Sequence, residues 1–178
     1  MSGRPFPAEA ARAVVEAAAD RGLVLATAES LTGGAVVARL VDVPGASRCL
    51  AGGAACYSYE AKQRVLGVDA ELLARDGAVT AQVAEQMARG ALEVYGADLA
   101  VSTTGVAGPG PDARGVAAGT VHLGLACREA DAGDVVRIRV RTAEHRFAGD
   151  RAAVRAQAVD AAIALLRDAL GAEARPCA

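Results

Sequence analysis

The sequence predicts a three-layer α/β/α sandwich built on a mixed, mostly parallel sheet. Helical and strand-like segments alternate along most of the chain, and the expected strands are short apolar runs of the kind buried in such sheets. A chain of 178 residues, 53% of them hydrophobic, has room for one domain with a proper core. We expect a single domain over residues 1–178, with its core at about 8–170 and a loose tail at 171–178.

The first half of the chain alternates between the two periodicities. Apolar residues recur at helical spacing over residues 8–21, and Gly22 ends that helix. The short apolar runs at 23–29 and 49–58 predict two buried strands. A glycine-bearing turn and a helix at 35–43 lie between them.

The second half continues the pattern after a short helix that begins near Tyr59. Thr80 is a good N-cap for a helix that Gly96 ends, and a third strand follows at 97–105. The remaining expected elements are a loop at 106–119, strands at 119–127 and 134–144 joined by a turn, and a final helix at 149–170 opened by Asp150. Arginines alternate with β-branched residues in the last strand, so we expect it at a sheet edge.

Composition excludes several classes of function. The net charge is −2, and acidic and basic residues are interspersed along the chain. This pattern is not typical of a protein that binds nucleic acid through a basic surface or a membrane through a polybasic patch. The sequence shows neither a signal-peptide pattern nor an apolar run of about 18 residues, so we expect a cytoplasmic protein with reduced thiols. The four cysteines form no CxxC pair and only two histidines could assist them, so we expect no metal site.

Four polar segments, three of which contain glycine, stand where ligands gather in open α/β sheets, after strands or at a helix start. They are ESLTGG (29–34), YSYEAK (57–62), STTGVAGPG (102–110) and FAGDR (147–151). Free backbone N–H groups in such turns, together with Arg151, suit an anionic, phosphorylated small ligand. The ordinary reading of each segment alone is a helix cap, and neither GxxxxGK[ST] nor GxGxxG accompanies them.

Lys62 is the only lysine in a chain with 18 arginines. An ammonium pKa falls on burial whereas a guanidinium stays protonated, so Lys62 is a candidate general base. The alternative is that lysine has been depleted by compositional bias and that this one survives without a role. A Ser–Lys dyad requires a nearby hydroxyl, and spacing alone leaves both Ser47 and Ser30 open.

Six ordered motifs carry a resemblance to a known family: TAESLTGG, PGAS, YSYEAK, STTGVAGP, GTV and FAGDRAAVRAQA. Over about residues 8–170 the chain resembles the C-terminal domain of the CinA family, whose enzymatically active members are nicotinamide-nucleotide amidohydrolases. The resemblance implies deamidation of nicotinamide mononucleotide to nicotinate mononucleotide and ammonia, without metal or cofactor. It also implies a homo-oligomer.

The resemblance assigns residue roles that spacing leaves open. It implies Ser47 as nucleophile, Lys62 as base and Tyr57 as an assisting group, with Arg151 holding the phosphate. The other implied substrate-binding residues are Ser30, Thr32, Gly33, Gly34, Thr104, Gly105 and Gly108.

The sequence departs from the family pattern at three places. Relatives usually have ESCTGG and YSNEAK, whereas this chain has Leu31 in place of the cysteine and Tyr59 in place of the asparagine. In the long loop, Val116 and Ala117 replace a Lys-Pro pair. The loop thereby loses a cation and a second glycine. Two other functions stay open: a catalytically inactive nucleotide-binding or regulatory module, and a hydrolase of another small amide.

Overall fold

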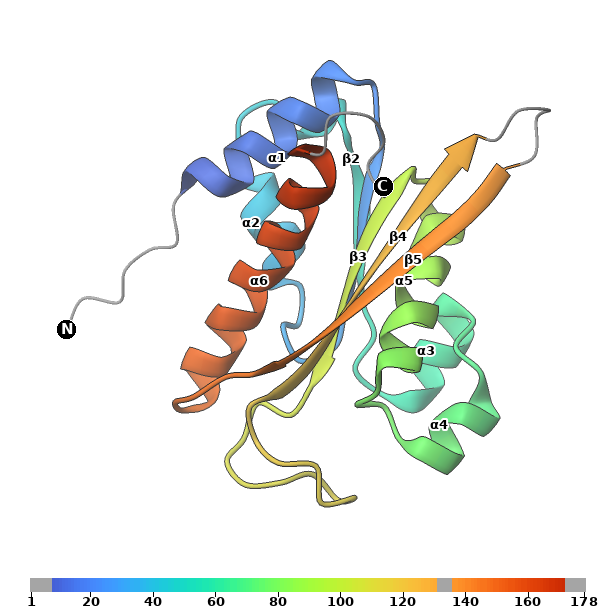
Figure 1. Cartoon of the computed structure of the whole chain (residues 1–178), viewed down its shortest axis with the longest axis vertical. Coiled ribbons are helices and arrows are strands. Elements are labelled where there is room, and N and C mark those ends of the chain that lie inside the picture. The colour runs from blue at the N-terminus through green and yellow to red at the C-terminus, as the bar shows by residue number, and fades with distance from the viewer. Residues whose placement is uncertain (1–7, 131–135, 172–178) are drawn as a thin grey trace.

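A five-stranded sheet with strand order β2–β1–β3–β4–β5 organises the chain (Figure 1). The computed structural model describes residues 8–130 and 136–171. β1 (Leu25–Glu29) pairs in parallel with both β2 (Leu50–Ala55) and β3 (Leu99–Gly105). β4 (Thr120–Ala130) pairs antiparallel with β3 and with β5 (Val136–Arg146). The expected mixed sheet is confirmed, with two parallel and two antiparallel pairings.

Helices cover both faces of the sheet, which makes the three layers (Figure 1). The helices α1 (Ala8–Asp20), α2 (Ala35–Val41) and α6 (Arg151–Gly171) pack on one face. The other face carries α3 (Tyr59–Leu66), α4 (Ala70–Asp76) and α5 (Ala81–Tyr95). Each of the two helical layers buries its own apolar cluster against the sheet, made mainly of alanine, valine and leucine side chains.

Several expected boundaries are confirmed by the caps that form there. The Thr80 hydroxyl accepts the Val83 N–H at 3.1 Å, and the Asp150 carboxylate accepts the Ala153 N–H at 2.9 Å. The strand rich in arginine is β5, which lies at one edge of the sheet as expected. The expected tail at 171–178 and the turn before β5 lie largely outside the described residues.

Two short helices had not been expected. The segment 69–77 forms α4, because the Asp69 carboxylate accepts the Glu71 N–H at 2.8 Å and Gly77 ends the helix. The PGAS segment forms a 3-10 helix at Ala46–Arg48 that follows Gly45, which has a φ of 90°. Both segments are too short for a helical hydrophobic pattern to be visible.

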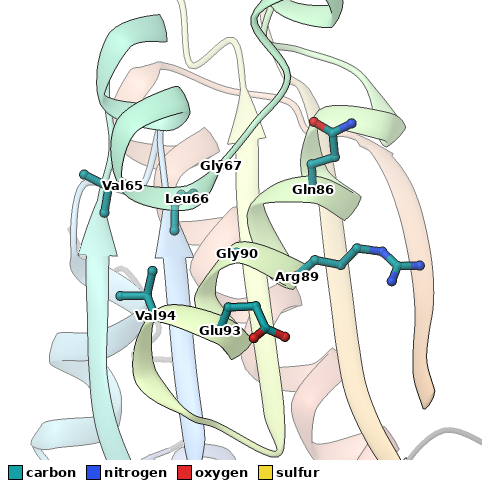
Figure 2. A pocket seen from close by; sticks show the side chains of 8 residues that line it. All are labelled: Val65, Leu66, Gly67, Gln86, Arg89, Gly90, Glu93 and Val94. Carbon is teal, nitrogen blue, oxygen red and sulfur yellow. The ribbon is translucent and has the colours of Figure 1, made fainter. Parts of the chain in front are cut away.

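Gly90 sets how closely α3 approaches α5. A Cβ on Gly90 would lie 2.0 Å from the Leu66 carbonyl oxygen, so only glycine permits this contact. A groove of about 390 Å³ runs along the contact between the two helices, and Figure 2 shows its lining residues. They are Val65, Leu66, Gly67, Gln86, Arg89, Gly90, Glu93 and Val94. The close packing holds α3, and with it Lys62, against the sheet.

The cysteines do not all behave alike. Cys49 and Cys56 are free and buried, as expected. Cys127 is disulfide-bonded, so the expectation of reduced thiols is wrong for this residue. Within residues 8–130 and 136–171, no cluster of three His, Cys, Asp or Glu side chains could hold a metal ion. Over the same residues no helix is both long and apolar enough to span a membrane.

Candidate functional site

Lys62 is fully buried, and its amino group has three oxygen atoms as hydrogen-bond partners. Nζ lies 2.9 Å from Ser30 Oγ, 2.8 Å from the Cys56 carbonyl oxygen and 3.3 Å from the Tyr57 carbonyl oxygen. Ser58 caps α3 by accepting the Ala61 N–H, which starts the helix where its first turn carries Lys62 back toward the end of β1. Among the described residues no carboxylate forms an ion pair with Lys62.

Burial makes the neutral form of this amine easier to reach than in an exposed lysine. Burial lowers the pKa of Lys62 from its usual value near 10.5 to about 8, and Cys56 opposes the shift. About a tenth of the molecules then carry a neutral Lys62 at pH 7. A neutral amine has a lone pair that can accept the proton of the Ser30 hydroxyl.

The turn that presents Ser30 is built around the carboxylate of Glu29, the last residue of β1. This buried carboxylate accepts five hydrogen bonds, two from the Thr27 and Thr32 hydroxyls and three from the N–H groups of Gly34, Val36 and Val37, at 2.7 to 3.1 Å. The carboxylate therefore serves as the cap of α2. Gly33 and Gly34 have φ values of 64° and 95°, which explains why glycines stand there.

Two neighbouring elements hold the same turn from outside. The Arg155 guanidinium, on α6, donates to the carbonyl oxygens of Leu31 and Thr32 at 2.9 Å each. The Ser30 N–H donates to the Thr103 carbonyl at 2.9 Å, and the Thr103 and Thr32 hydroxyls lie 2.7 Å apart. The position of Ser30 is thus fixed by β1, β3 and α6 together.

Ser47 does not come near Lys62 within one chain. It lies in the 3-10 helix before β2, where it lines a different hollow with Pro44 and Leu50. Lys62 follows the opposite end of β2, and a six-residue strand spans about 20 Å. Within one chain the structure therefore does not bring Ser47 and Lys62 together, and the hydroxyl beside the amine belongs to Ser30, which spacing had left open.

Ser30 and Lys62 open into a cavity of about 290 Å³ at the carboxyl ends of the parallel strands. Its other lining residues are Leu31, Tyr57, Tyr59, Ala78, Val79, Thr104, Gly105, Ala107, Asp112, Ala113, Arg114 and Arg151. We call this cavity the site pocket.

The remaining expected site residues divide into lining and supporting groups. Tyr57, Thr104, Gly105 and Arg151 line the site pocket, although the Thr104 hydroxyl donates to the Ala78 carbonyl at 2.6 Å. Thr32, Gly33 and Gly34 build the turn behind it, and Gly108 contributes a carbonyl oxygen to Arg151. The structure thus brings together all the expected residues except Ser47.

Arg151, the first residue of α6, connects three parts of the pocket wall. Its guanidinium donates to the Tyr57 hydroxyl at 3.0 Å and to the Gly108 carbonyl at 2.9 Å. Tyr57 remains 66% exposed despite this bond, so both groups are accessible to a ligand that enters the pocket.

Sequence reasoning missed three contributors to the site. Glu29 and Arg155 lie inside motifs named in the sequence analysis. Nothing in their spacing shows that the Glu29 carboxylate and the Arg155 guanidinium would both hydrogen-bond to the turn that follows β1. Arg114 lies in the long loop, and its place in the pocket depends on how that loop folds. An exposed arginine in a loop gives no periodic signal that could have identified it.

Comparison with known proteins gives consistent matches. The sequence profile of the CinA C-terminal domain matches residues 8–170. A CinA-like protein of Mycobacterium sp. (strain MCS) is 48% identical over 149 residues, covering 84% of this chain and 34% of the relative. One from Chlorobaculum tepidum is 46% identical over 138 residues, covering 78% and 32%. The chain thus spans about a third of the length of these curated relatives.

Solved structures match over nearly the whole chain. A CinA superfamily protein of Klebsiella pneumoniae is 36% identical with a TM-score of 0.83, covering 94% of this chain and 98% of that one. The competence/damage-inducible protein of Agrobacterium tumefaciens is 36% identical with a TM-score of 0.79, covering 93% and 97%.

Proposed function

This chain belongs to the CinA C-terminal domain family, and from that membership we propose that it is an amidohydrolase that converts nicotinamide mononucleotide to nicotinate mononucleotide and ammonia. Ser30 is the nucleophile and Lys62 the general base. The observation that carries the proposal is the 2.9 Å contact between Lys62 Nζ and Ser30 Oγ, made by an amine whose pKa burial lowers to about 8.

The first half of the reaction forms an acyl-enzyme. Neutral Lys62 takes the Ser30 proton while Oγ attacks the carboxamide carbon, which gives a tetrahedral intermediate. The Lys62 ammonium then protonates the departing nitrogen, the C–N bond breaks and ammonia leaves.

The second half regenerates the enzyme. Lys62 accepts a proton from water, whose oxygen attacks the ester carbon, and the Ser30 oxygen leaves with a proton from Lys62. The products are nicotinate mononucleotide and the free Ser30 hydroxyl.

The oxyanion requires hydrogen-bond donors beside Ser30. The backbone N–H groups of Leu31 and Thr32 follow the nucleophile directly and donate to no other group in the described part of the chain. We assign them this role, because one oxyanion donor typically lowers the barrier by about 3 kcal/mol. Arg151 holds the substrate phosphate, exchanging its bonds to Tyr57 and Gly108 for charge-assisted ones.

Ammonia release from nicotinamide mononucleotide by the purified protein tests this proposal, beside Lys62→Arg and Ser30→Ala. We expect turnover by the wild type and its loss in both variants, with far-ultraviolet circular dichroism unchanged. A wild type that binds the nucleotide and releases no ammonia would favour the nucleotide-binding module instead. Release from a panel of other small amides but not from the mononucleotide would point to a different amidohydrolase.

We also propose that the protein forms a homo-oligomer through the open edge of β2. This strand, LAGGAA, carries neither charge nor proline, and Ala51 and Ala55 are exposed on it. Exposed Val41 lines a hollow with Leu50 at the same edge. A second copy offers the same uncharged strand, so the two can pair antiparallel about a two-fold axis.

A further inference from the structure

We propose that Arg114 is a specificity-determining residue of the site pocket, where together with Arg151 it selects a substrate that bears a phosphate group. The inference deepens the proposed function and rests on it for the identity of the nucleotide. The family pattern noted in the sequence analysis has a lysine in the long loop, where this chain has Val116 and Ala117. Arg114 supplies a positive charge in the same loop.

A tight turn in the loop presents Arg114. Asp112 Oδ1 accepts the Arg114 N–H at 2.9 Å and the Val116 N–H at 2.8 Å. The Asp112 N–H donates to the Val116 carbonyl at 3.0 Å, and the Gly115 N–H donates to the Asp112 carbonyl at 3.0 Å. Asp112 is the one carboxylate that lines the site pocket, and this turn already uses one of its two oxygens.

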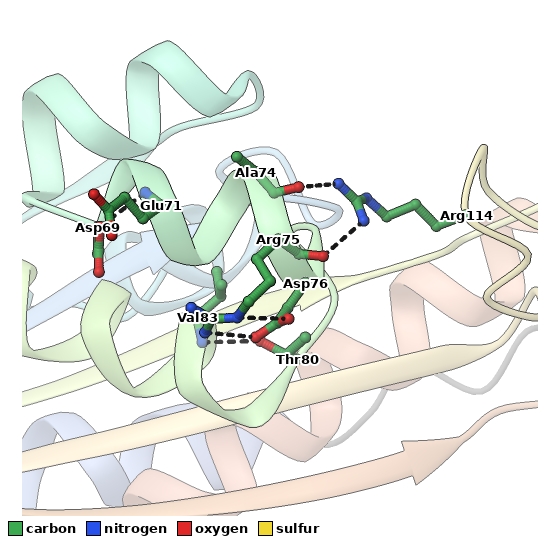
Figure 3. A network of polar contacts seen from close by, with 8 residues as sticks. All are labelled: Asp69, Glu71, Ala74, Arg75, Asp76, Thr80, Val83 and Arg114. Atoms are coloured by element: carbon green, nitrogen blue, oxygen red, sulfur yellow. Dashed lines mark hydrogen bonds and ion pairs between the residues drawn. The ribbon is translucent and has the colours of Figure 1, made fainter.

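The Arg114 side chain is seated against α4. Its guanidinium donates to the Ala74 carbonyl at 2.5 Å and to the Arg75 carbonyl at 3.0 Å, as Figure 3 shows. These carbonyls belong to the last turn of α4, where the helix dipole favours a cation. The charge is therefore held in a defined place although the side chain is exposed.

Gly77 leaves room for the Arg114 side chain to lie against α4. A Cβ on Gly77 would lie 2.6 Å from Arg114 Cδ and 3.5 Å from the Tyr59 hydroxyl. Arg114 and Tyr59 therefore lie against the same bare backbone and form one wall of the site pocket.

The donors of Arg114 are only partly used. A guanidinium carries five N–H groups, and in the described residues two of them are occupied by the carbonyls of α4. Arg114 and Arg151 give the site pocket two positive charges against the single carboxylate of Asp112, and these two charges remain when Lys62 is neutral. A phosphate dianion matches that excess of positive charge, whereas an uncharged nucleoside does not.

Steady-state kinetics with a phosphorylated and an unphosphorylated substrate test the inference. Arg114→Ala should raise KM for nicotinamide mononucleotide about tenfold and change kcat less than about twofold, the effect of one lost charge-assisted contact. KM for nicotinamide riboside should stay unchanged. KM of Arg114→Lys should lie between the values of wild type and Arg114→Ala. Lysine keeps the positive charge but lacks the planar guanidinium that can pair with two phosphate oxygens at once. Arg167→Ala, which removes an exposed arginine outside the pocket, should behave as wild type.

Calorimetric titration with ribose 5-phosphate separates this inference from the proposed reaction, because binding requires no turnover. We expect binding by wild type and about tenfold weaker binding by Arg114→Ala. That result without ammonia release would support Arg114 and overturn the proposed reaction. An unchanged KM in Arg114→Ala, an equal loss for both substrates, or no binding of ribose 5-phosphate by wild type would each overturn the role of Arg114.

Discussion

At the scale of single residues, the pKa of Lys62 is lowered although no carboxylate in the described part of the chain pairs with it. Burial is the main reason that its pKa falls to about 8, and the described residues supply only hydroxyl and carbonyl oxygens around it. An arginine at this place would remain charged at any pH the fold tolerates. The sequence singled out Lys62 because it has no other lysine, whereas its burial depends on α3 packing against α5.

The activity should therefore depend on pH as the titration of Lys62 dictates. The base acts in its neutral form, so kcat/KM should rise with pH and level off above about 8. A stopped assay of ammonia release from pH 6 to 9.5 measures this profile. A profile that falls over pH 7 to 8.5 would contradict the assignment of Lys62 as base.

The lowered pKa of Lys62 should also make the free energy of unfolding depend on pH. Between pH 8 and 10.5 the unfolded state holds a proton on Lys62 that the native state has lost, so native stability rises with pH across that window. The free energy of unfolding of wild type minus that of Lys62→Met should increase by up to about 3 kcal/mol over that window. Urea titrations at several pH values measure it, and other titrating groups cancel in the difference. A difference independent of pH would mean that the amine is not perturbed.

The choice of serine offers a direct contrast. Ser30→Ala should lower kcat at least about a thousandfold, the effect expected when a nucleophile is removed. Ser47→Ala should lower kcat less than Ser30→Ala, because within its own chain Ser47 lies beyond the other end of β2, and only the antiparallel β2 pairing proposed above brings the Ser47 of a second copy toward the site. The two variants form a matched pair in the ammonia assay. A loss in Ser47→Ala alone would restore Ser47 as the nucleophile, and equal losses would mean that the Ser47 of a second copy is also required at the site.

Sequence reasoning located the candidate site segments but not which serine lies beside Lys62. Ser30 and Ser47 both stand in turns beside apolar strands, and local pattern does not say which end of a strand faces which neighbour. The direction and register of β2 against β1 decide the matter, and those are properties of the folded sheet.

At the scale of elements, the junction of β1 and α2 concentrates the most polar contacts of the site. Glu29 receives five hydrogen bonds there, and Arg155 grips the next two carbonyls from α6. The strand, the glycine turn and the helix were all predicted from sequence, because apolar runs and glycines signal them. The carboxylate that ties them together was not, since a glutamate before a turn has many possible roles.

Glu29→Gln should damage both stability and catalysis. An amide offers one acceptor oxygen in place of two, so it leaves buried N–H or O–H donors unpaired, each costing about 1–3 kcal/mol. We expect a lower free energy of unfolding in urea and a reduced kcat for the folded variant, because Ser30 loses its fixed position. Thr32→Val, which removes only one donor to Glu29, should show a smaller loss of stability. Wild-type stability in Glu29→Gln would argue against this account of the turn.

At the scale of the whole molecule, the strand order determines where the site pocket lies. Site-pocket residues follow β1, β2 and β3 at their carboxyl ends, while β4 and β5 extend the sheet on the side away from β2. Sequence patterns sufficed for the layers and the strand count. They could not give the short helix α4 or the fold of the long loop, which together form the wall that carries Arg114.

The open edge of β2 should govern assembly. Light scattering coupled to size exclusion should give a mass above 17.8 kDa for the wild type, and Ala51→Lys with Ala55→Lys should shift it toward that of one chain. Lysines at these exposed edge positions place like charges opposite each other in an antiparallel pair. Arg137→Lys, on the opposite edge of the sheet, serves as a control. An unchanged mass in the double variant would place the interface elsewhere.

A chain with one lysine has one side-chain amine to modify, and here that amine lines a ligand cavity. Small acylating reagents applied near pH 8 therefore have only two amine targets, the chain's amino terminus and Lys62, and the labelling rate of the fully buried Lys62 measures how often its surroundings open. A mass spectrum after such labelling would count occupancy of the cavity directly, since a bound nucleotide shields the amine. Burial and compositional scarcity together turn Lys62 into a built-in chemical reporter, usable for competitive screening of ligands without any engineered tag.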